Sequence, residues 1–112
     1  MKKNFLYIFC AILLVSCSAS EGESKTEKFN VYGNCTMCEK TIEGSLEGVE
    51  GVTEADWVVE SNEMSVSFDP EVITFDEIKQ KIADVGYDSD SHRAKDKVYD
   101  NLHGCCKYNR PE

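Results

Sequence analysis

The spacing of apolar residues changes several times between residues 28 and 91, and the order of these changes restricts the fold more than any other feature. Alternation of apolar and polar residues, which indicates a strand, occurs over residues 28–33, 54–60 and 64–69. Apolar residues recur every three or four positions over residues 38–49 and 75–85, which indicates two amphipathic helices. The predicted order therefore begins strand, helix, strand, strand, helix.

A short final strand over residues 87–91 would complete a βαββαβ order, although this segment is rich in Asp and Ser. The order is that of the ferredoxin-like sandwich, an α+β fold in which both helices pack on one face of an antiparallel sheet. In that fold the loop after the first strand lies beside the loop after the second helix. We therefore expect Gly86 and Tyr87 to lie near the residues that follow the first strand.

Local signals mark where the two helices begin and end. Thr36 with Glu39, and Thr74 with Glu77, have the spacing of a capping box, so each pair predicts a helix start. Gly86 is placed to end the second helix.

The two middle strands are expected to form a hairpin. Ser61-Asn62 predicts a two-residue turn between them, and Pro70 ends the second strand. Trp57 and Met64 alternate with polar neighbours and are assigned to the core.

Cys35 and Cys38 lie at the junction of the first strand and the first helix, and this position affects their chemistry. Two thiols at this spacing can hold one soft metal ion. The unpaired N–H groups at a helix N-terminus favour thiolate over thiol. Redox proteins, disulfides and zinc ribbons also use a CxxC, so the motif alone leaves several chemistries open.

Residues 1–16 have the layout of a signal peptide. A short basic start is followed by an apolar run over residues 5–15, about 11 residues, which is too short to span a bilayer. Residues 14–17, Leu-Val-Ser-Cys, resemble a bacterial lipobox, in which cleavage leaves Cys17 as a lipidated first residue; the alternative is an ordinary secretory signal cut nearby. Residues 17–27 then form a lipidated, solvated tether. We expect an exported protein, anchored by lipid to the bacterial cell envelope in the periplasm or at the outer membrane.

The remaining cysteines and the net charge restrict the possible functions further. With Cys10 in the signal peptide and Cys17 lipidated, four thiols are left for chemistry: Cys35, Cys38, Cys105 and Cys106. The formal net charge of the whole chain is −9, which argues against binding nucleic acid through its phosphates.

Residues 92–112 form a cysteine-containing tail. Apolar residues at helical spacing predict a short helix over residues 95–103, which Gly104 would end, delivering Cys105-Cys106. Adjacent cysteines are poor partners for each other, because a vicinal bridge is strained.

Three arrangements of Cys105 and Cys106 are open. They could bridge back to the CxxC motif, bridge another chain, or join the motif as metal ligands if the tail folds back. Two thiolates suit copper(I) or mercury(II), whereas three or four suit zinc, cadmium or a shielded copper. His92 and His103 are candidate further ligands, but we expect both to be surface histidines.

Residues 29–87 resemble a heavy-metal-associated domain, the module of copper chaperones, copper-ATPase N-terminal domains and the periplasmic mercury-binding protein. The matching residues are Cys35-x-x-Cys38, Ile42, Leu46, Gly51-Val52, Val66-x-Phe68-Asp69-Pro70 and Gly86-Tyr87. The resemblance implies a domain over residues 28–91 that acts as a metal carrier or scavenger, not an enzyme, with Cys35 and Cys38 as thiolate ligands. Copper(I) is the first candidate, zinc and mercury(II) are alternatives, and the partner would be a metal-transporting ATPase, an efflux pump or a sensor.

The chain departs from the family pattern next to the motif. The family has Met two residues before the first cysteine, whereas this chain has Gly33 there and Met37 between the cysteines. The change would loosen the loop, and Met37 could add a soft thioether contact. Tyr87 would either shield the metal or serve only as a packing aromatic.

Two other functions compete with metal carriage. A thiol–disulfide oxidoreductase could use the same helix-terminal cysteine, but neither Pro70 nor Pro111 suits the proline of a thioredoxin-like fold. A structural envelope module could use the cysteines as two disulfide braces. No arrangement for hydrolytic or transferase chemistry stands out.

Overall fold

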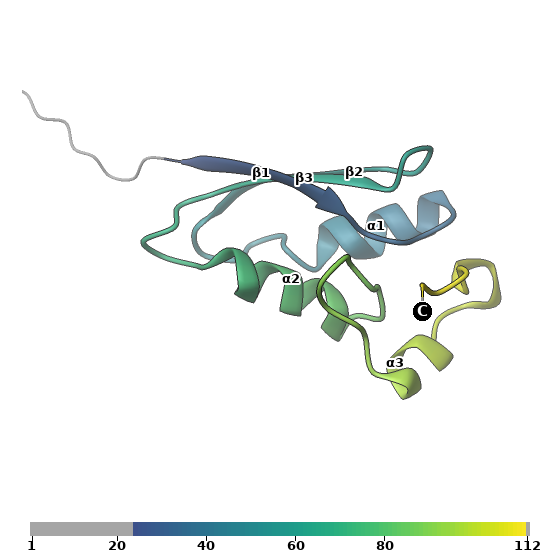
Figure 1. Ribbon diagram of the computed structural model, residues 1–112. Coiled ribbons are helices and arrows are strands. Elements are labelled where there is room, and N and C mark those ends of the chain that lie inside the picture. Colours follow the sequence, from purple (N-terminus) through teal and green to yellow (C-terminus); the bar gives the residue numbers. More distant parts are fainter. Residues whose placement is uncertain (1–23, 112) are drawn as a thin grey trace, which may run out of the picture.

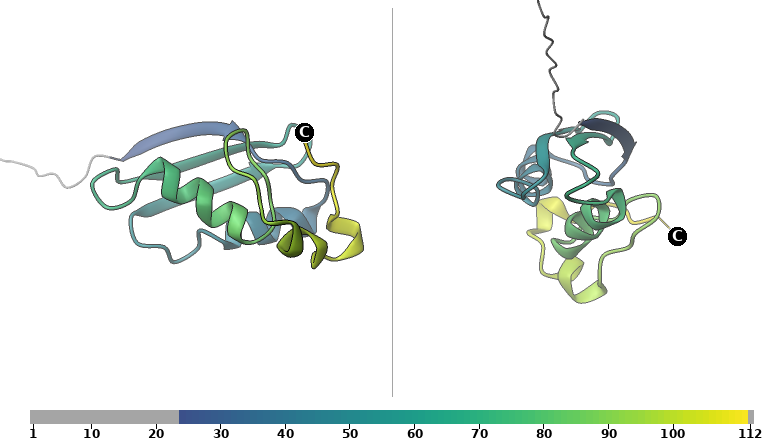
Figure 2. Two further views of the ribbon diagram at one scale, coloured as in Figure 1. Left: turned by 60° about the horizontal axis from the view of Figure 1, so that its bottom comes forward. Right: turned by 90° about the vertical axis from the view of Figure 1, so that its left-hand side faces the viewer.

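A three-stranded antiparallel sheet in the order β1-β3-β2 forms one layer of the molecule, and α1 and α2 lie side by side against one face of it (Figures 1 and 2). This computed structural model describes residues 24–111. The elements are β1 (Lys25–Asn30), α1 (Thr36–Gly44), β2 (Val52–Val58), β3 (Glu63–Phe68), α2 (Phe75–Asp84), α3 (Asp96–Asp100) and a short 3-10 helix, η1 (Gly104–Cys106). The predicted α+β class is confirmed.

The core lies between the sheet and the two helices. On β3 every second residue is buried, so Met64, Val66 and Phe68 face the helices. Trp57 on β2 is also buried, as predicted. The helices contribute the buried residues Cys38, Ile42, Ile78, Ile82 and Ala83, and the turn after α1 contributes Leu46.

The two helices begin differently. The predicted capping box at α2 is present, with the Glu77 N–H donating to Thr74 Oγ1 at 3.1 Å and the Thr74 N–H donating to the Glu77 carboxylate at 3.0 Å. The capping box predicted for Thr36 is wrong. Thr36 is already helical, and Cys35, with an extended backbone (φ −160°), is the residue that precedes the helix. A side-chain cap needs that extended position, and a cysteine occupies it.

The hairpin turn is longer than predicted. Residues 59–62 connect Val58 to Glu63, which face each other across the sheet. Asn62 adopts a left-handed backbone, and its carbonyl accepts the Val31 N–H at 2.9 Å. The turn opens because its last residue also bonds the chain that leaves β1, so the two-residue turn was wrong.

The edges of the predicted domain are also shifted. β1 starts at Lys25, inside the stretch predicted as a tether, because β3 is long enough to pair Lys25 with Phe68. The final strand predicted over residues 87–91 is wrong: it is reduced to a single bridge between Val31 and Ser89. The Asp88 carboxylate instead accepts hydrogen bonds from the Ala94 N–H and the Arg110 guanidinium, and the Ser89 N–H donates to the His92 carbonyl. The segment therefore leaves the edge of the sheet after one bridge.

The tail helix is shorter than predicted. α3 covers only Asp96–Asp100, and Gly104 begins η1 instead of ending the helix. The chain leaves the helix where the Leu102 side chain packs close to Gly86. Figures 1 and 2 show the tail returning beneath the N-terminal end of α1.

The signal peptide, Cys10 and the lipobox with Cys17 lie outside the described residues. Among the helices of residues 24–111, none is long and apolar enough to cross a membrane.

Candidate metal centre

The fold places the two cysteines of the CxxC motif side by side at the start of α1. The Cys35 and Cys38 sulfurs are 3.4 Å apart. Cys35 is partly exposed, whereas Cys38 is fully buried in the first helical turn. One soft ion can therefore reach both sulfurs, with one side of the pair open to exchange.

The surroundings favour the thiolate at Cys35. Its partial burial acts to raise its pKa, but the backbone N–H of Cys38 and the thiols of Cys38 and Cys106 more than offset this, and the pKa of Cys35 lies below its ordinary value of 9.0. Cys38 donates from its thiol to the Asn34 side-chain carbonyl at 3.3 Å. No sequence pattern identified Asn34, because its role depends on the loop conformation.

The tail brings a third thiol to this pair. The Cys106 sulfur lies 3.8 Å from that of Cys35, and its backbone carbonyl lies 4.0 Å from the Cys38 sulfur. Cys106 is 2% exposed. Burial raises the pKa of Cys106 to about 12, and the thiols of Cys38 and Cys35 add to the increase. Cys106 is thus a protonated thiol in the metal-free protein, and an ion that binds it must displace the proton.

Cys105 and Met37 lie on the solvent side of the same group. The Cys105 sulfur is 3.9 Å from that of Cys106 and 3.6 Å from the thioether sulfur of Met37. Both side chains are exposed, Met37 by 44%. The sulfurs of Cys35, Cys105 and Cys106 all lie within 4.8 Å of one another. All four thiols of the described chain are free.

Tyr87 lies beneath these thiols with an unsatisfied hydroxyl. Its side chain is fully buried, and the hydroxyl has no hydrogen-bond partner within residues 24–111. Burial raises the pKa of Tyr87 far above its ordinary value, and the neighbouring thiols of Cys38 and Cys106 raise it further. Tyr87 also stacks on Tyr108, with ring centroids 5.5 Å apart, so it packs as well as facing the site. A buried hydroxyl without a partner beside thiols is suited to donate to a metal-bound thiolate.

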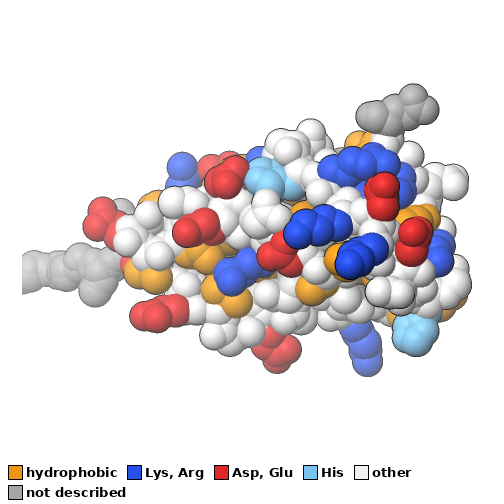
Figure 3. Space-filling model, turned by 90° about the horizontal axis from the view of Figure 1, so that it is seen from below, with side chains coloured by type: hydrophobic (Ala, Val, Ile, Leu, Met, Phe, Trp, Pro, Cys, Tyr) orange, Lys and Arg blue, Asp and Glu red, His pale blue; other side chains and the backbone are white. Residues whose placement is uncertain are grey.

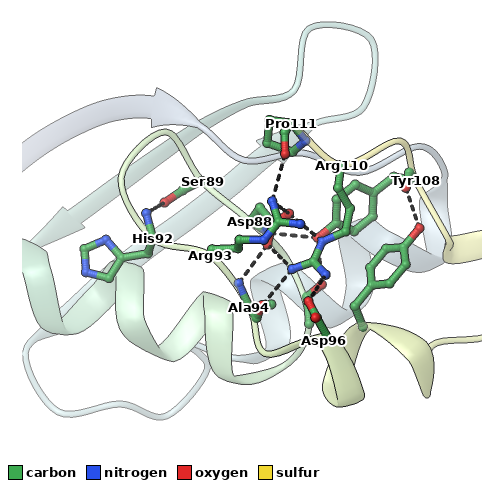
Figure 4. A network of polar contacts seen from close by, with 11 residues as sticks. Asp88, Ser89, His92, Arg93, Ala94, Asp96, Tyr108, Arg110 and Pro111 are labelled. Carbon is green, nitrogen blue, oxygen red and sulfur yellow. Dashed lines mark hydrogen bonds and ion pairs between the residues drawn. The ribbon is translucent and has the colours of Figure 1, made fainter.

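A buried ion pair fastens the tail to the loop after α2 (Figure 4). Arg110 contacts both carboxylate oxygens of Asp88 at 2.9 Å, and Asp88 is 1% exposed. Asp88 also accepts the Ala94 N–H at 2.7 Å, while Arg110 reaches Asp96 at 2.9 Å. We refer to these four residues as the Asp88–Arg110 network.

Two tyrosines extend this attachment toward the cysteines. The Tyr108 hydroxyl donates to the Gly86 carbonyl at 2.8 Å and accepts the Asp88 N–H at 2.9 Å. The Tyr99 hydroxyl donates to the Tyr108 carbonyl at 2.6 Å. Cys106 is the last residue of η1 and lies two residues before Tyr108, so these contacts position its thiol. No sequence pattern identified Tyr108 or Arg110, since each acts on residues about twenty positions away.

The missing methionine at position 33 has a structural counterpart. A Cβ on Gly33 would lie 2.9 Å from the ring of Trp57, so the indole fills the space that a larger side chain would need. The Trp57 Nε1–H donates to the Val31 carbonyl at 2.8 Å, and the Asn62 amide donates to the Gly33 carbonyl at 3.0 Å. The loop is therefore held by other residues, and the expected loosening does not follow.

The histidines lie elsewhere. His92 pairs with Asp76 of α2 at 3.0 Å, and His103 is exposed ahead of η1. Within residues 24–111, neither histidine belongs to a group of side chains placed to hold a metal ion. Besides the cysteines, one such group is present, formed by the acidic residues Glu39, Glu43 and Asp56. In that set Glu43 accepts the Trp57 N–H at 2.8 Å, which gives it a structural role.

The sulfur separations indicate the coordination that the site can offer. With bonds of about 2.3 Å, two sulfurs on one ion stand about 4.6 Å apart in linear, about 4.0 Å in trigonal and about 3.8 Å in tetrahedral geometry. The observed 3.4 Å and 3.8 Å from Cys35 to Cys38 and to Cys106 are closer to the trigonal and tetrahedral values. Cys35 can therefore share one soft ion with Cys38 or with Cys106, and the three sulfurs that all lie within 4.8 Å of one another are those of Cys35, Cys105 and Cys106.

Comparison with known proteins agrees with this geometry. The model of the heavy-metal-associated domain matches residues 30–88, more than half of the chain. The chain belongs to the heavy-metal-associated domain family. It is a heavy-metal-binding domain in class, and the match ends before the tail that carries Cys105 and Cys106.

Two curated relatives show the range of this family. The chain is 36% identical to the copper chaperone CopZ of Staphylococcus aureus over an alignment of 63 residues. This alignment covers 55% of this chain and 93% of CopZ. The chain is also 41% identical to a zinc-transporting ATPase of Synechocystis sp. over 64 residues. This alignment covers 56% of this chain but only 9% of the ATPase.

Solved structures confirm the ferredoxin-like fold. A CopZ metallochaperone aligns with a TM-score of 0.56 at 35% identity, over 58% of this chain and 98% of its own. Oxidized MerP from Ralstonia metallidurans CH34 aligns with a TM-score of 0.50 at 26% identity, over 58% of this chain and 94% of its own.

Proposed function

We propose that this protein is an exported carrier or scavenger of a soft metal ion, held by the thiolates of Cys35, Cys38 and Cys106. The observation that carries the proposal is the contact of the Cys106 sulfur, from a tail outside the family domain, with the Cys35 sulfur at 3.8 Å. Cys35 and Cys38 supply the pair that the family predicts. Cys106 closes the pair on the side where Tyr87 lies.

Of the three candidate ions, copper(I) suits this site best. Thiolates select soft ions, and copper(I) accepts three sulfur ligands without needing a fourth. Zinc and mercury(II) are the alternatives. Zinc would need a fourth ligand, for which Cys105 is available at 3.9 Å from Cys106. A family relative named a copper chaperone supports the first choice.

The partner and location are proposed from the sequence. A carrier of this kind would exchange its ion with a metal-transporting ATPase, an efflux pump or a sensor. The signal-like residues 1–16 and the lipobox at Cys17 support export and a lipid anchor at the bacterial envelope. The acidic tether that follows would hold the domain away from the membrane surface.

Competitive titration of the reduced full chain with copper(I), zinc and mercury(II) tests this function. We expect one copper(I) to bind, with loss of binding in Cys35→Ser together with Cys38→Ser. Asn109→Ala, an exposed tail residue without sulfur, is the matched control and should bind as the parent does. Catalytic reduction of insulin disulfides without uptake of any of the three ions would favour the oxidoreductase instead.

A further inference from the structure

Five sulfur atoms form one continuous row from the surface to the interior. In order they belong to Met37, Cys105, Cys106, Cys35 and Cys38. Successive separations are 3.6, 3.9, 3.8 and 3.4 Å. We refer to these atoms as the sulfur row. The family domain supplies both ends of the row, and the tail supplies its middle.

The five sulfurs differ in exposure. Met37 is 44% exposed and Cys105 is also exposed, Cys35 is partly exposed, and Cys106 and Cys38 are 2% and 0% exposed. Met37 and Cys105 are therefore the sulfurs most accessible to an ion that arrives from solvent or from a partner protein. Cys38 and Cys106 are buried, and the Asp88–Arg110 network holds the tail that carries Cys106 in place.

We propose that Met37 and Cys105 form an outer site that receives a soft cation and passes it inward along the sulfur row to Cys35, Cys38 and Cys106. This inference rests on the proposed function, since it needs the inner site as its destination. It assigns the two exposed sulfurs a kinetic role that is separate from equilibrium binding. The ligand class is a soft monovalent or divalent cation delivered as a labile complex.

The spacing allows the ion to keep two sulfur bonds at every step. An ion with bonds of about 2.3 Å can touch two sulfurs up to about 4.6 Å apart. The largest separation in the row, 3.9 Å between Cys105 and Cys106, is below that limit. The ion therefore never has to be released to water between the outer and inner sites.

Each step is a ligand exchange without a change of oxidation state. The bond from the ion to the Met37 thioether breaks as a bond to Cys106 forms, and the Cys106 proton leaves to solvent. The bond to Cys105 then breaks as a bond to the Cys35 thiolate forms, and Cys105 takes up a proton in place of the one it lost to solvent when the ion left its donor's ligands for Met37 and Cys105. A bond to Cys38 forms last, and the Cys38 thiol proton leaves to solvent. Met37 needs no proton at either stage, which suits it to be the first and last ligand.

Stopped-flow transfer of copper(I) from its coloured bicinchoninate complex tests the row. The full chain is used in detergent, reduced, with Cys10→Ser and Cys17→Ser in every sample so that the described thiols are the only ones. Met37→Leu and Cys105→Ser are compared with Asn109→Ala as the matched control. Both test positions are exposed, so neither change removes core packing.

We expect Met37→Leu and Cys105→Ser each to slow uptake roughly tenfold or more, because a positioned exchange step is lost. The equilibrium affinity should stay within about twofold, so release to excess bicinchoninate slows by the same factor as uptake. Asn109→Ala should match the parent in both measurements.

Two results would overturn the relay while leaving the proposed function intact. One is an uptake rate unchanged in both variants, which would mean that the ion enters directly at Cys35. The other is an affinity that falls as far as the rate in Cys105→Ser, which would make Cys105 an inner ligand. Failure of the parent itself to take up copper(I) is a distinct outcome, and it would overturn the relay together with the copper(I) function.

Discussion

At the scale of single residues, the loop before Cys35 is held by Trp57 and Asn62 where the family has a methionine. The indole occupies the space beside Gly33, and the Asn62 amide bonds the Gly33 carbonyl. The glycine is required by this close approach, since any Cβ would contact the ring at 2.9 Å. The loop therefore has a different support from its relatives, and the two positions should be coupled.

Restoring the family residue should accordingly destabilise the protein. We expect Gly33→Met to lower the free energy of unfolding by about 1–3 kcal/mol, because the core around Trp57 becomes overpacked. In a Trp57→Val background the same change should cost less, because the ring that it overpacks is absent. Gly44→Ala is the matched control, since nothing lies within 4 Å of its added Cβ, and it should stabilise α1 by about 0.5–1 kcal/mol. Equal effects of Gly33→Met with and without Trp57→Val, in urea unfolding, would contradict the coupling.

Removal of the Tyr87 hydroxyl distinguishes the two roles considered for Tyr87, which are to shield the metal or only to pack as an aromatic. In the metal-free protein Tyr87→Phe removes an unpartnered buried hydroxyl, so the free energy of unfolding should stay the same or rise slightly. In the loaded protein the hydroxyl would donate to a thiolate, and we expect its loss to weaken copper(I) binding roughly tenfold. A copper(I) affinity equal to that of the parent would leave Tyr87 as a packing aromatic only.

At the scale of elements, the sequence predicted those whose signals are local and missed those that depend on distant residues. Periodicity identified α2 and β3, and the Thr74–Glu77 capping box was placed correctly because all its atoms lie within four residues. The start of α1 was assigned one residue late, since Cys35 takes a position that usually has a polar cap.

The errors at the sheet edges have the same cause. The turn after β2 and the segment after α2 are shaped by bonds to Val31, Ala94 and Arg110, which lie far away in the sequence. The four cysteines of the candidate site were all named from the sequence. The path of the tail could not be predicted, because no periodic pattern in the sequence signals the pairing of Asp88 with Arg110.

The ion pair of Asp88 and Arg110 is the buried charged contact that holds the tail on the domain. Arg110→Ala leaves the Asp88 carboxylate buried without its cation, a change that typically costs about 3–5 kcal/mol. We expect the tail to open, seen as faster hydrogen exchange of the Cys106 and Tyr108 amides while the amides of β3 keep their protection. Arg93→Ala is the matched control, because Arg93 is exposed and stands 4.0 Å from the same carboxylate. Unchanged exchange in Arg110→Ala would contradict this role of the network.

The same contact predicts an acid transition of the tail. Burial alone would raise the pKa of Asp88, but Arg110 and the Ala94 N–H outweigh it and hold the pKa below its ordinary 3.8. A lowered carboxyl pKa contributes stability that is complete above the unfolded value and is lost as pH falls through the folded value. The near-ultraviolet circular dichroism of the stacked tyrosines should therefore stay constant down to about pH 4 and fall below it. Asp88→Asn should lack the native signal at neutral pH, whereas Asp96→Asn should keep it.

At the scale of the whole molecule, charge is divided between the domain and its tail. Residues 92–111 carry five basic and two acidic side chains in a chain whose formal net charge is −9. Figure 3 shows Lys and Arg side chains gathered where the tail lies. The basic tail is thus attracted to an acidic domain, which favours the closed arrangement at low salt and weakens with screening. The buried pair of Asp88 and Arg110 is less affected by salt, so closure persists.

X-ray absorption of the copper(I)-loaded full chain tests the central claim most directly, because it counts the sulfur neighbours of the ion. A site closed by the tail predicts three sulfurs at about 2.3 Å in the parent, and two after Cys106→Ser. Asn109→Ala should keep three. Two sulfurs in the parent, unchanged by Cys106→Ser, would show that the tail thiol does not bind the ion and would contradict the account.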